Sequence, residues 1–122
     1  MERSIYVVED NASIRELIAF LLTEEAYLVK TYSNLTSFWD DLSVKKPDLI
    51  VLDVMLPDGN GIEVCSKLKS DRKTHQIPVM MMSANNQLHL LKNKCPAQEF
   101  INKPLDLNDF AKRVASNLRS VI

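Results

Sequence analysis

The chain has few cysteines and no long hydrophobic run. Its two cysteines, Cys65 and Cys95, stand in no C-x-x-C motif and near no Cys/His cluster, which argues against structural zinc and a disulfide framework. Reduced thiols are therefore expected. No apolar run approaches the ~20 residues of a membrane span, and the first one is too short for a signal peptide. These absences predict a cytoplasmic protein with no membrane partner.

The chain also lacks a large charge of either sign. Fifteen Lys and Arg against sixteen Asp and Glu give a formal net charge of −1 at pH 7. A protein with so little net charge has no general attraction to phosphate backbones, so direct binding to nucleic acid is not expected. The length of 122 residues and the hydrophobic content of 46% are typical of one globular domain. We expect a single domain over residues 1–122.

Short apolar runs alternate with segments in which apolar residues recur at helical spacing. The runs predict strands over residues 5–8, 27–32, 48–54, 79–83 and 99–102. The helical segments cover residues 12–25, 35–45, 62–72, 87–94 and 107–121, with Asn11 or Ser13, Ser33 or Asn34, and Asp106 or Asn108 as N-caps. Such alternation predicts an α/β fold with a parallel sheet covered on both faces.

Two segments of the chain differ from the regular alternation of strands and helices. Residues 57–61 contain both glycines of the chain beside a proline and an aspartate, which predicts a turn or loop. The helix expected over residues 87–94 spans only about two turns before Pro96, so its stability should be marginal.

Polar residues with phosphate or cation chemistry lie at the carboxyl ends of four of the predicted strands: Glu9 and Asp10, Asp53, Ser83, and Lys103. Ligands of parallel sheets bind outside the carboxyl ends of the strands, where these side chains should meet. Three neighbouring carboxylates repel one another unless a cation binds or a pKa rises. The three acids, one hydroxyl and one ammonium predict a divalent cation beside a phosphoryl group.

These strand-end motifs carry a family resemblance. In chain order they are Glu9-Asp10, Asp53 in Leu-Asp-Val-Met-Leu-Pro-Asp-Gly, Ser83-Ala84, and Phe100-Ile-Asn-Lys103-Pro104. Together they resemble the receiver domain of two-component response regulators, over nearly the whole chain. The resemblance implies a flavodoxin-like, doubly wound five-stranded sheet of order 2-1-3-4-5 with five helices. It also implies a phosphorelay function, in which a histidine kinase transfers a phosphoryl group to an aspartate.

The resemblance implies a role for each site residue. Asp53 would be the phospho-acceptor, a nucleophile already ionised at neutral pH. Asp10, Asp53 and the Met55 carbonyl would bind Mg²⁺ (or Mn²⁺) directly, with Glu9 acting through a water. Lys103 would neutralise the carboxylates and hold a phosphoryl oxygen.

Other implied roles have simpler alternatives. Ser83 and the Ala84 amide would bind another phosphoryl oxygen, although a serine here can equally cap a helix. Phe100 would swing inward together with Ser83 on phosphorylation, although ordinary core packing also explains an aromatic there. Glu9 and Asp10 can also be N-terminal helix charges. The sequence departs from the family's pattern at Ala26, where glycine is usual.

We expect a stand-alone or excised receiver that works as a phosphorylation-controlled switch. Its expected chemistry is limited to Mg²⁺-dependent self-phosphorylation and self-dephosphorylation of Asp53, so it is not a conventional enzyme. The expected partners are a sensor histidine kinase or histidine phosphotransfer protein and a downstream protein. A homodimer would use the face formed by the fourth helix, fifth strand and fifth helix.

Three alternatives remain open. A pseudo-receiver would bind its partner without phosphorylation, but it would not need Asp53 and Lys103. A haloacid-dehalogenase-like phosphatase would carry a second acid two residues after the nucleophile, where this chain has Met55. An FMN-binding flavodoxin would have a hydroxyl-rich loop after the first strand, where Glu9 and Asp10 would repel the phosphate.

Overall fold

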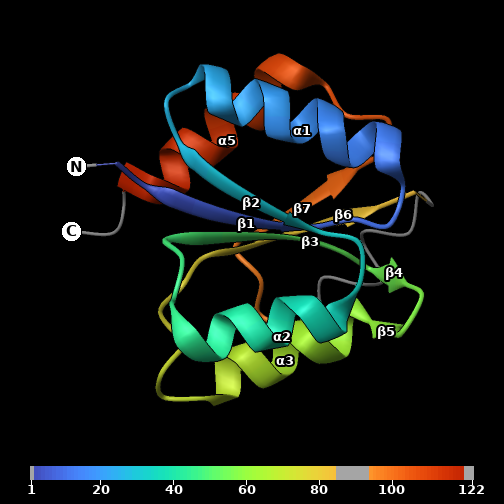
Figure 1. Ribbon diagram of the computed structural model, residues 1–122, viewed down its shortest axis with the longest axis vertical. Helices are drawn as coiled ribbons and strands as arrows, with labels where there is room; N and C mark the ends of the chain where they lie inside the picture. Colours follow the sequence, from blue (N-terminus) through green and yellow to red (C-terminus); the bar gives the residue numbers. More distant parts are fainter. Residues whose placement is uncertain (1, 85–93, 120–122) are drawn as a thin grey trace.

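A central parallel sheet separates two pairs of helices in the computed structural model, which describes residues 2–84 and 94–119 (Figure 1). The sheet strands are β1 (Ser4–Val8), β2 (Leu28–Tyr32), β3 (Leu49–Asp53), β6 (Val79–Ser83) and β7 (Glu99–Asn102). The helices within these ranges are α1 (Ala12–Glu24), α2 (Leu35–Val44), α3 (Gly61–Ser70) and α5 (Leu107–Arg119). None of these helices is long and apolar enough to cross a membrane.

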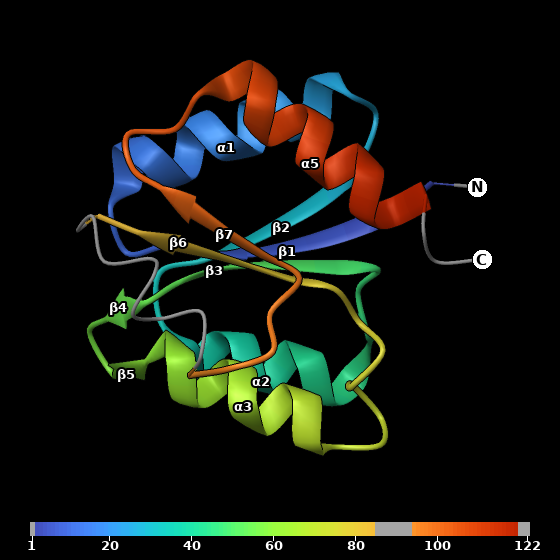
Figure 2. The same ribbon diagram turned by 180° about the vertical axis from the view of Figure 1, so that it is seen from behind.

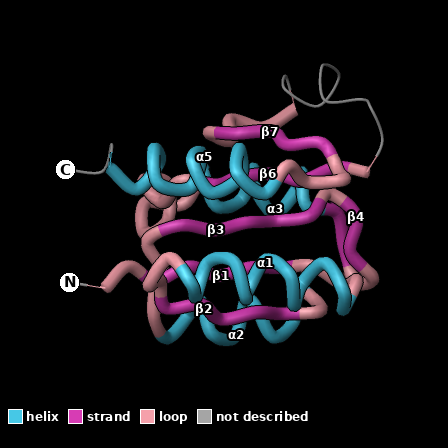
Figure 3. Tube along the Cα trace, turned by 90° about the horizontal axis from the view of Figure 1, so that it is seen from above, coloured by secondary structure: helices cyan, strands magenta, loops and turns pink. Residues whose placement is uncertain are grey.

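The strand order is β2-β1-β3-β6-β7, with every pair parallel. Because β6 and β7 are the fourth and fifth strands of this sheet, the predicted order 2-1-3-4-5 and the doubly wound flavodoxin-like fold are confirmed. The register pairs Val8 with Leu52, Asp53 with Met82, and Ser83 with Asn102. The strands therefore end together, so residues that follow them lie at one edge of the sheet (Figure 3).

The two faces of the sheet bury different helices. Helices α1 and α5 cover one face, and α2 and α3 cover the other (Figures 1 and 2). Alternate strand residues divide between these layers: Ile5 and Val7 pack on the α1/α5 side, whereas Tyr6 and Val8 pack on the opposite side. All five residues of β3 are buried. This burial on both faces explains why the central strands appear in the sequence as continuous apolar runs.

The predicted caps lie where the helices begin. Asn11 Oδ1 accepts a hydrogen bond from the Ile14 amide at 3.0 Å, and Asn34 Oδ1 accepts one from the Ser37 amide at 3.0 Å. Before α5, Asp106 Oδ1 accepts from the Asp109 amide at 3.1 Å. Each cap satisfies an amide that has no partner within the first helical turn.

The turn or loop that the sequence predicts over residues 57–61 is part of a small hairpin, which the sequence does not predict. Two short antiparallel strands form this hairpin, β4 (Met55–Leu56) and β5 (Gly59–Asn60). Only two residues pair on each strand, a length too short for an alternating apolar pattern. The fourth predicted helix falls mostly on residues 85–93, which lie outside the described residues.

Ala26 has an unusual backbone conformation between α1 and β2. Its φ angle of 69° lies in the left-handed region, and it is the one non-glycine residue with positive φ in the described ranges. The Cβ atom makes this conformation unfavourable by roughly 1–2 kcal/mol. The structure thus gives a physical reason for the glycine that the family usually has at this turn.

Candidate functional site

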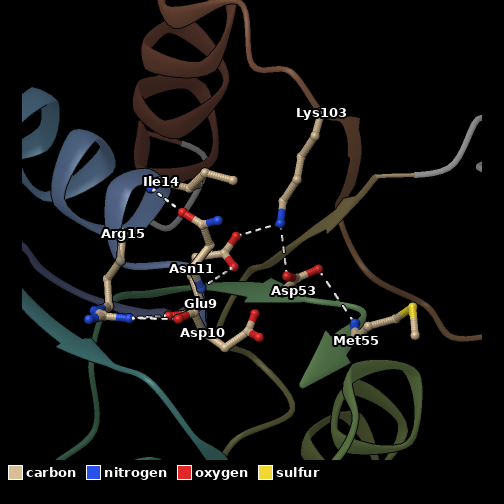
Figure 4. A network of polar contacts seen from close by, with 8 residues as sticks. All are labelled: Glu9, Asp10, Asn11, Ile14, Arg15, Asp53, Met55 and Lys103. Atoms are coloured by element: carbon tan, nitrogen blue, oxygen red, sulfur yellow. Dashed lines mark hydrogen bonds and ion pairs between the residues drawn. The ribbon is translucent and has the colours of Figure 1, made fainter. Parts of the chain in front are cut away.

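The carboxyl ends of the strands bring five predicted site residues to one edge of the sheet. Glu9 and Asp10 follow β1, Asp53 ends β3, Ser83 ends β6, and Lys103 follows β7. Figure 4 shows the carboxylates of Glu9 and Asp53 on either side of the Lys103 ammonium, with Asp10 close by. Residues up to 94 positions apart in sequence therefore form one cluster.

Lys103 joins the two buried carboxylates. Its Nζ donates a hydrogen bond to Asp53 Oδ2 at 2.8 Å and forms an ion pair with Glu9 Oε1 at 2.5 Å. The side chains of Glu9, Asp53 and Lys103 are 0%, 8% and 12% exposed. Buried Glu9 Oε1 accepts no well-aligned hydrogen bond, so its stabilisation is chiefly ionic. Such an atom suits a further cationic ligand.

Burial and charge act in opposite directions on the two ionised partners. Desolvation raises the pKa of Glu9 above its ordinary value, although the contact with the Lys103 ammonium acts to lower it. For Lys103, desolvation lowers the pKa, but the contacts with Asp53 and Glu9 and their negative charges outweigh it and raise the pKa overall. Lys103 is therefore a permanent cation at neutral pH, held by the two carboxylates.

The acidic residues fit a divalent cation. One carboxylate oxygen each from Glu9, Asp10 and Asp53 lies within 4.8 Å of the other two. Three carboxylates against one ammonium leave two negative charges in excess, and Mg²⁺ prefers such hard oxygen ligands. Asp10 is exposed, which leaves one side of the cluster open to solvent. The donor set therefore has the chemistry and the excess charge that this cation requires.

The backbone around Asp53 is closely packed. The Val54 amide donates to the Met82 carbonyl at 3.0 Å, and the Gly61 amide donates to the Val54 carbonyl at 2.7 Å. A Cβ atom at Gly61 would lie 2.1 Å from the Asp53 carbonyl oxygen. Gly61 has no positive φ, so glycine is needed here for space. The Met55 amide lies 3.4 Å from Asp53 Oδ1, which places the Met55 backbone beside the carboxylate.

Of the remaining predicted site residues, Ser83 and Ala84 lie at the same edge, and Phe100 lies two residues before the end of β7. Ser83 is buried, and its carbonyl accepts a hydrogen bond from the Lys103 amide at 2.9 Å. Ala84 is exposed next to it. Phe100, in β7, is half-buried and packs against the core layer on the α2/α3 side. Strand β7 therefore connects the Phe100 position to Lys103 at the cluster.

Sequence reasoning missed two residues that support the site. Arg15 Nη1 donates to the carbonyl oxygens of Glu9 and Asp10 at 2.8 and 3.2 Å (Figure 4). Asp58, in the hairpin turn, accepts hydrogen bonds from the Leu35 and Thr36 amides at 2.8 and 3.1 Å and so caps α2. Only the position of Arg15, one turn into the helix that follows the acidic pair, could have indicated its contact. No feature of the neighbouring sequence could have indicated the contacts of Asp58.

Comparison with known proteins agrees with this combination of a doubly wound sheet and an acidic strand-end site. The family model described as the response regulator receiver domain matches residues 5–115. The phosphate regulon transcriptional regulatory protein PhoB of Escherichia coli (strain K12) is 33% identical over 99% of this chain and 54% of its own length. The receiver domain of a signal transduction histidine kinase from Syntrophus aciditrophicus has a TM-score of 0.90 at 29% identity, over 98% of this chain and 92% of that one.

A receiver domain described as BeF3-activated DrrB has a TM-score of 0.84 at 27% identity, over 98% of this chain and 99% of that one. The chain belongs to the response regulator receiver domain family of two-component signalling. It spans about half the length of the curated relatives it matches. The resemblance of the strand-end motifs to this family is therefore confirmed.

Proposed function

We propose that Asp53 accepts a phosphoryl group from a phosphohistidine and that this modification switches the binding of a protein partner. The observation that carries the proposal is the placement of Asp53. Its carboxylate ends the buried central strand, 2.8 Å from the Lys103 ammonium and beside Glu9 and Asp10. An ionised carboxylate held in this way is a nucleophile that needs no base to remove a proton.

The transfer would be an in-line displacement. A carboxylate oxygen of Asp53 forms the new bond to phosphorus while the bond to the donor's histidine nitrogen breaks. The electron pair of the broken bond stays on the imidazole, which takes a proton from solvent. Lys103, already hydrogen-bonded to Asp53, stabilises the negative charge of the transferring group. Positioning and charge neutralisation thus supply the catalysis.

Mg²⁺ or Mn²⁺ would be held by Asp10, Asp53 and the Met55 carbonyl, with Glu9 acting through a water. When bound, the cation would neutralise the phosphoryl oxygens. The carboxylates of Glu9, Asp10 and Asp53 are close enough to share one ion. Without the cation, the excess negative charge of these carboxylates would repel the phosphoryl group. The Asp10→Ala variant should therefore lose Mg²⁺ binding, whereas Glu9→Gln should only weaken it.

Ser83 and the Ala84 amide would bind another phosphoryl oxygen, and Phe100 would move inward as Ser83 moves. Ser83 ends β6 and pairs with Asn102 of β7, and Phe100 lies two residues before Asn102 on the same strand, which supports this coupling. The phosphodonor would be a sensor histidine kinase or a histidine phosphotransfer protein in the cytoplasm. A downstream protein, or a second copy through the face that includes β7 and α5, would recognise the changed surface. A pseudo-receiver, which works unphosphorylated, is the alternative.

Mass spectrometry after incubation with Mg²⁺ and phosphoramidate tests the proposal. The parent protein should gain one phosphate that is labile to acid and base, and Asp53→Asn should gain none. Asp40→Asn is the matched control, because Asp40 is an exposed aspartate of α2 outside the acidic cluster and its loss should leave the modification intact. A folded parent that stays unmodified would favour the pseudo-receiver. Equal modification of Asp53→Asn would refute the assignment of the acceptor.

A further inference from the structure

At the site, the Arg15 side chain donates its hydrogen bonds to backbone carbonyl oxygens. The half-buried side chain extends from α1 toward β1, and Nη1 lies 2.8 Å from the Glu9 carbonyl oxygen and 3.2 Å from that of Asp10. Within residues 2–84 and 94–119, Arg15 forms no ion pair, although acidic side chains are its neighbours. Its guanidinium therefore neutralises none of the carboxylates of the cluster by direct pairing (Figure 4).

We propose that Arg15 is a positioning residue for the cation site: it holds the Glu9–Asp10 backbone so that both carboxylates face Asp53. The inference rests on the proposed function, because it presumes that this cluster binds Mg²⁺. Arg15 touches neither the cation nor the phosphoryl group. It acts through the turn that carries two of the ligands.

The contacts around the turn show where this support matters. Glu9 is held by its amide, which donates to the Tyr32 carbonyl at 3.0 Å, and by Oε2, which accepts from the Asn11 amide at 3.1 Å. Asp10 has less support: its exposed carboxylate has no hydrogen bond or ion pair to the described part of the chain. The hydrogen bond from Arg15 to its carbonyl therefore restrains the ligand that the protein holds least firmly.

Positioning and electrostatics predict opposite signs for the loss of Arg15. A guanidinium near a cation site repels the incoming cation, so removing the charge should by itself tighten Mg²⁺ binding. Removing the two carbonyl hydrogen bonds should loosen the turn and weaken binding. Loss of a group that orients metal ligands typically lowers affinity about 10–100-fold. The sign of the change therefore separates the two roles.

Isothermal titration of Mg²⁺ into the metal-free protein is the test. Arg15→Gln should bind about tenfold more weakly than the parent. Arg15→Lys keeps a charged donor on a longer side chain, whereas the glutamine amide is two bonds shorter than the guanidinium and should not reach the two carbonyls, so Arg15→Lys should bind more tightly than Arg15→Gln. Lys112→Gln, which removes a positive charge from the exposed face of α5, should match the parent. Affinity of Arg15→Gln equal to or above that of the parent would overturn the proposal.

Two further measurements keep the interpretation unambiguous. If the parent itself binds no Mg²⁺ or Mn²⁺, the proposed cation site is wrong, and the role of Arg15 falls with it. If the parent binds and Arg15→Gln binds equally well, only the role of Arg15 is wrong. Urea unfolding of Arg15→Gln should show a midpoint near that of the parent, and its amide NMR shifts should change mainly at Asp10 and Asn11. Shifts spread over the whole sheet would instead indicate a general structural role and contradict the proposal.

Discussion

The two edges of the sheet both carry an acid–base pair, but in opposite environments. At the carboxyl edge, Lys103 and Asp53 meet at 2.8 Å with side chains 12% and 8% exposed. At the amino edge, Arg3 and Asp48 lie 4.0 Å apart with side chains 39% and 42% exposed. Water screens the second pair and not the first. The comparison shows that burial, more than the residue types, distinguishes the electrostatics of the two edges.

The largest effect should come from removing the cation of the buried pair. Lys103→Met leaves the Glu9 and Asp53 carboxylates buried without their counter-charge, which should lower the free energy of unfolding by about 3 kcal/mol in metal-free buffer. Arg3→Met at the exposed edge should cost less than about 1 kcal/mol. Urea denaturation of both variants measures the difference. Equal losses would show that the two edges do not differ energetically.

Packing beside Asp53 gives the next effect. Gly61→Ala places a Cβ atom against the Asp53 backbone oxygen, which should cost about 2 kcal/mol and slow phosphorylation by shifting the acceptor. Gly59→Ala is the control, because its Cβ would meet only Leu35 Cδ1, the end of a flexible side chain, at 2.6 Å. Thermal unfolding and phosphate incorporation report the two consequences. If Gly61→Ala kept the stability and the phosphate incorporation of the parent, the backbone segments of Gly61 and Asp53 could move apart at no cost in free energy.

A smaller effect of opposite sign is expected away from the site. Ala26→Gly relieves the left-handed conformation at φ 69°, and part of that gain is lost to the greater freedom of glycine in the unfolded chain. A net stabilisation of about 0.5–1 kcal/mol should result. The same substitution at Ala19, inside α1, should instead destabilise by about 1 kcal/mol. The denaturation midpoints of the two variants should move in opposite directions.

The smallest effect concerns an exposed charge next to the site. Hydrogen bonds from the Leu35 and Thr36 amides lower the pKa of Asp58 below 3.8. A lowered folded-state pKa stabilises the fold above the unfolded-state pKa, and the stabilisation disappears as the pH falls through the folded-state value. Asp58→Ala should therefore lower the melting temperature at pH 7 and have less effect below pH 3.8. An equal loss of melting temperature at pH 7 and below pH 3.8 would contradict this prediction.

Sequence reasoning located most of the fold because its signals were local. The continuous apolar runs marked the strands, and β7 was predicted over the residues that the structure assigns to it. Asn11 and Asn34 marked helix starts because a capping side chain acts within three residues. The hairpin of β4 and β5 was missed because two-residue strands carry no period that a sequence can display.

The candidate site was predictable for a different reason. Parallel strands place their ends at one edge, so Glu9, Asp53 and Lys103 could be grouped before any distance was known. Arg15 and Asp58 were missed because their side chains bond to backbone groups beyond the three residues over which a helix cap acts. The Asp58 contacts also span 22 and 23 residues. Contacts of this kind become visible only when the chain is folded.

Lys103 has a consequence for the order in which the protein assembles. It directly follows β7, the edge strand that pairs on one side with β6, and it reaches Asp53 across a sequence separation of 50 residues. A contact between residues so distant in the chain forms only after the intervening loop has closed. The site therefore exists only in molecules whose last strand has docked. Any ligand that requires the intact site must, by mass action, slow hydrogen exchange of the β7 amides.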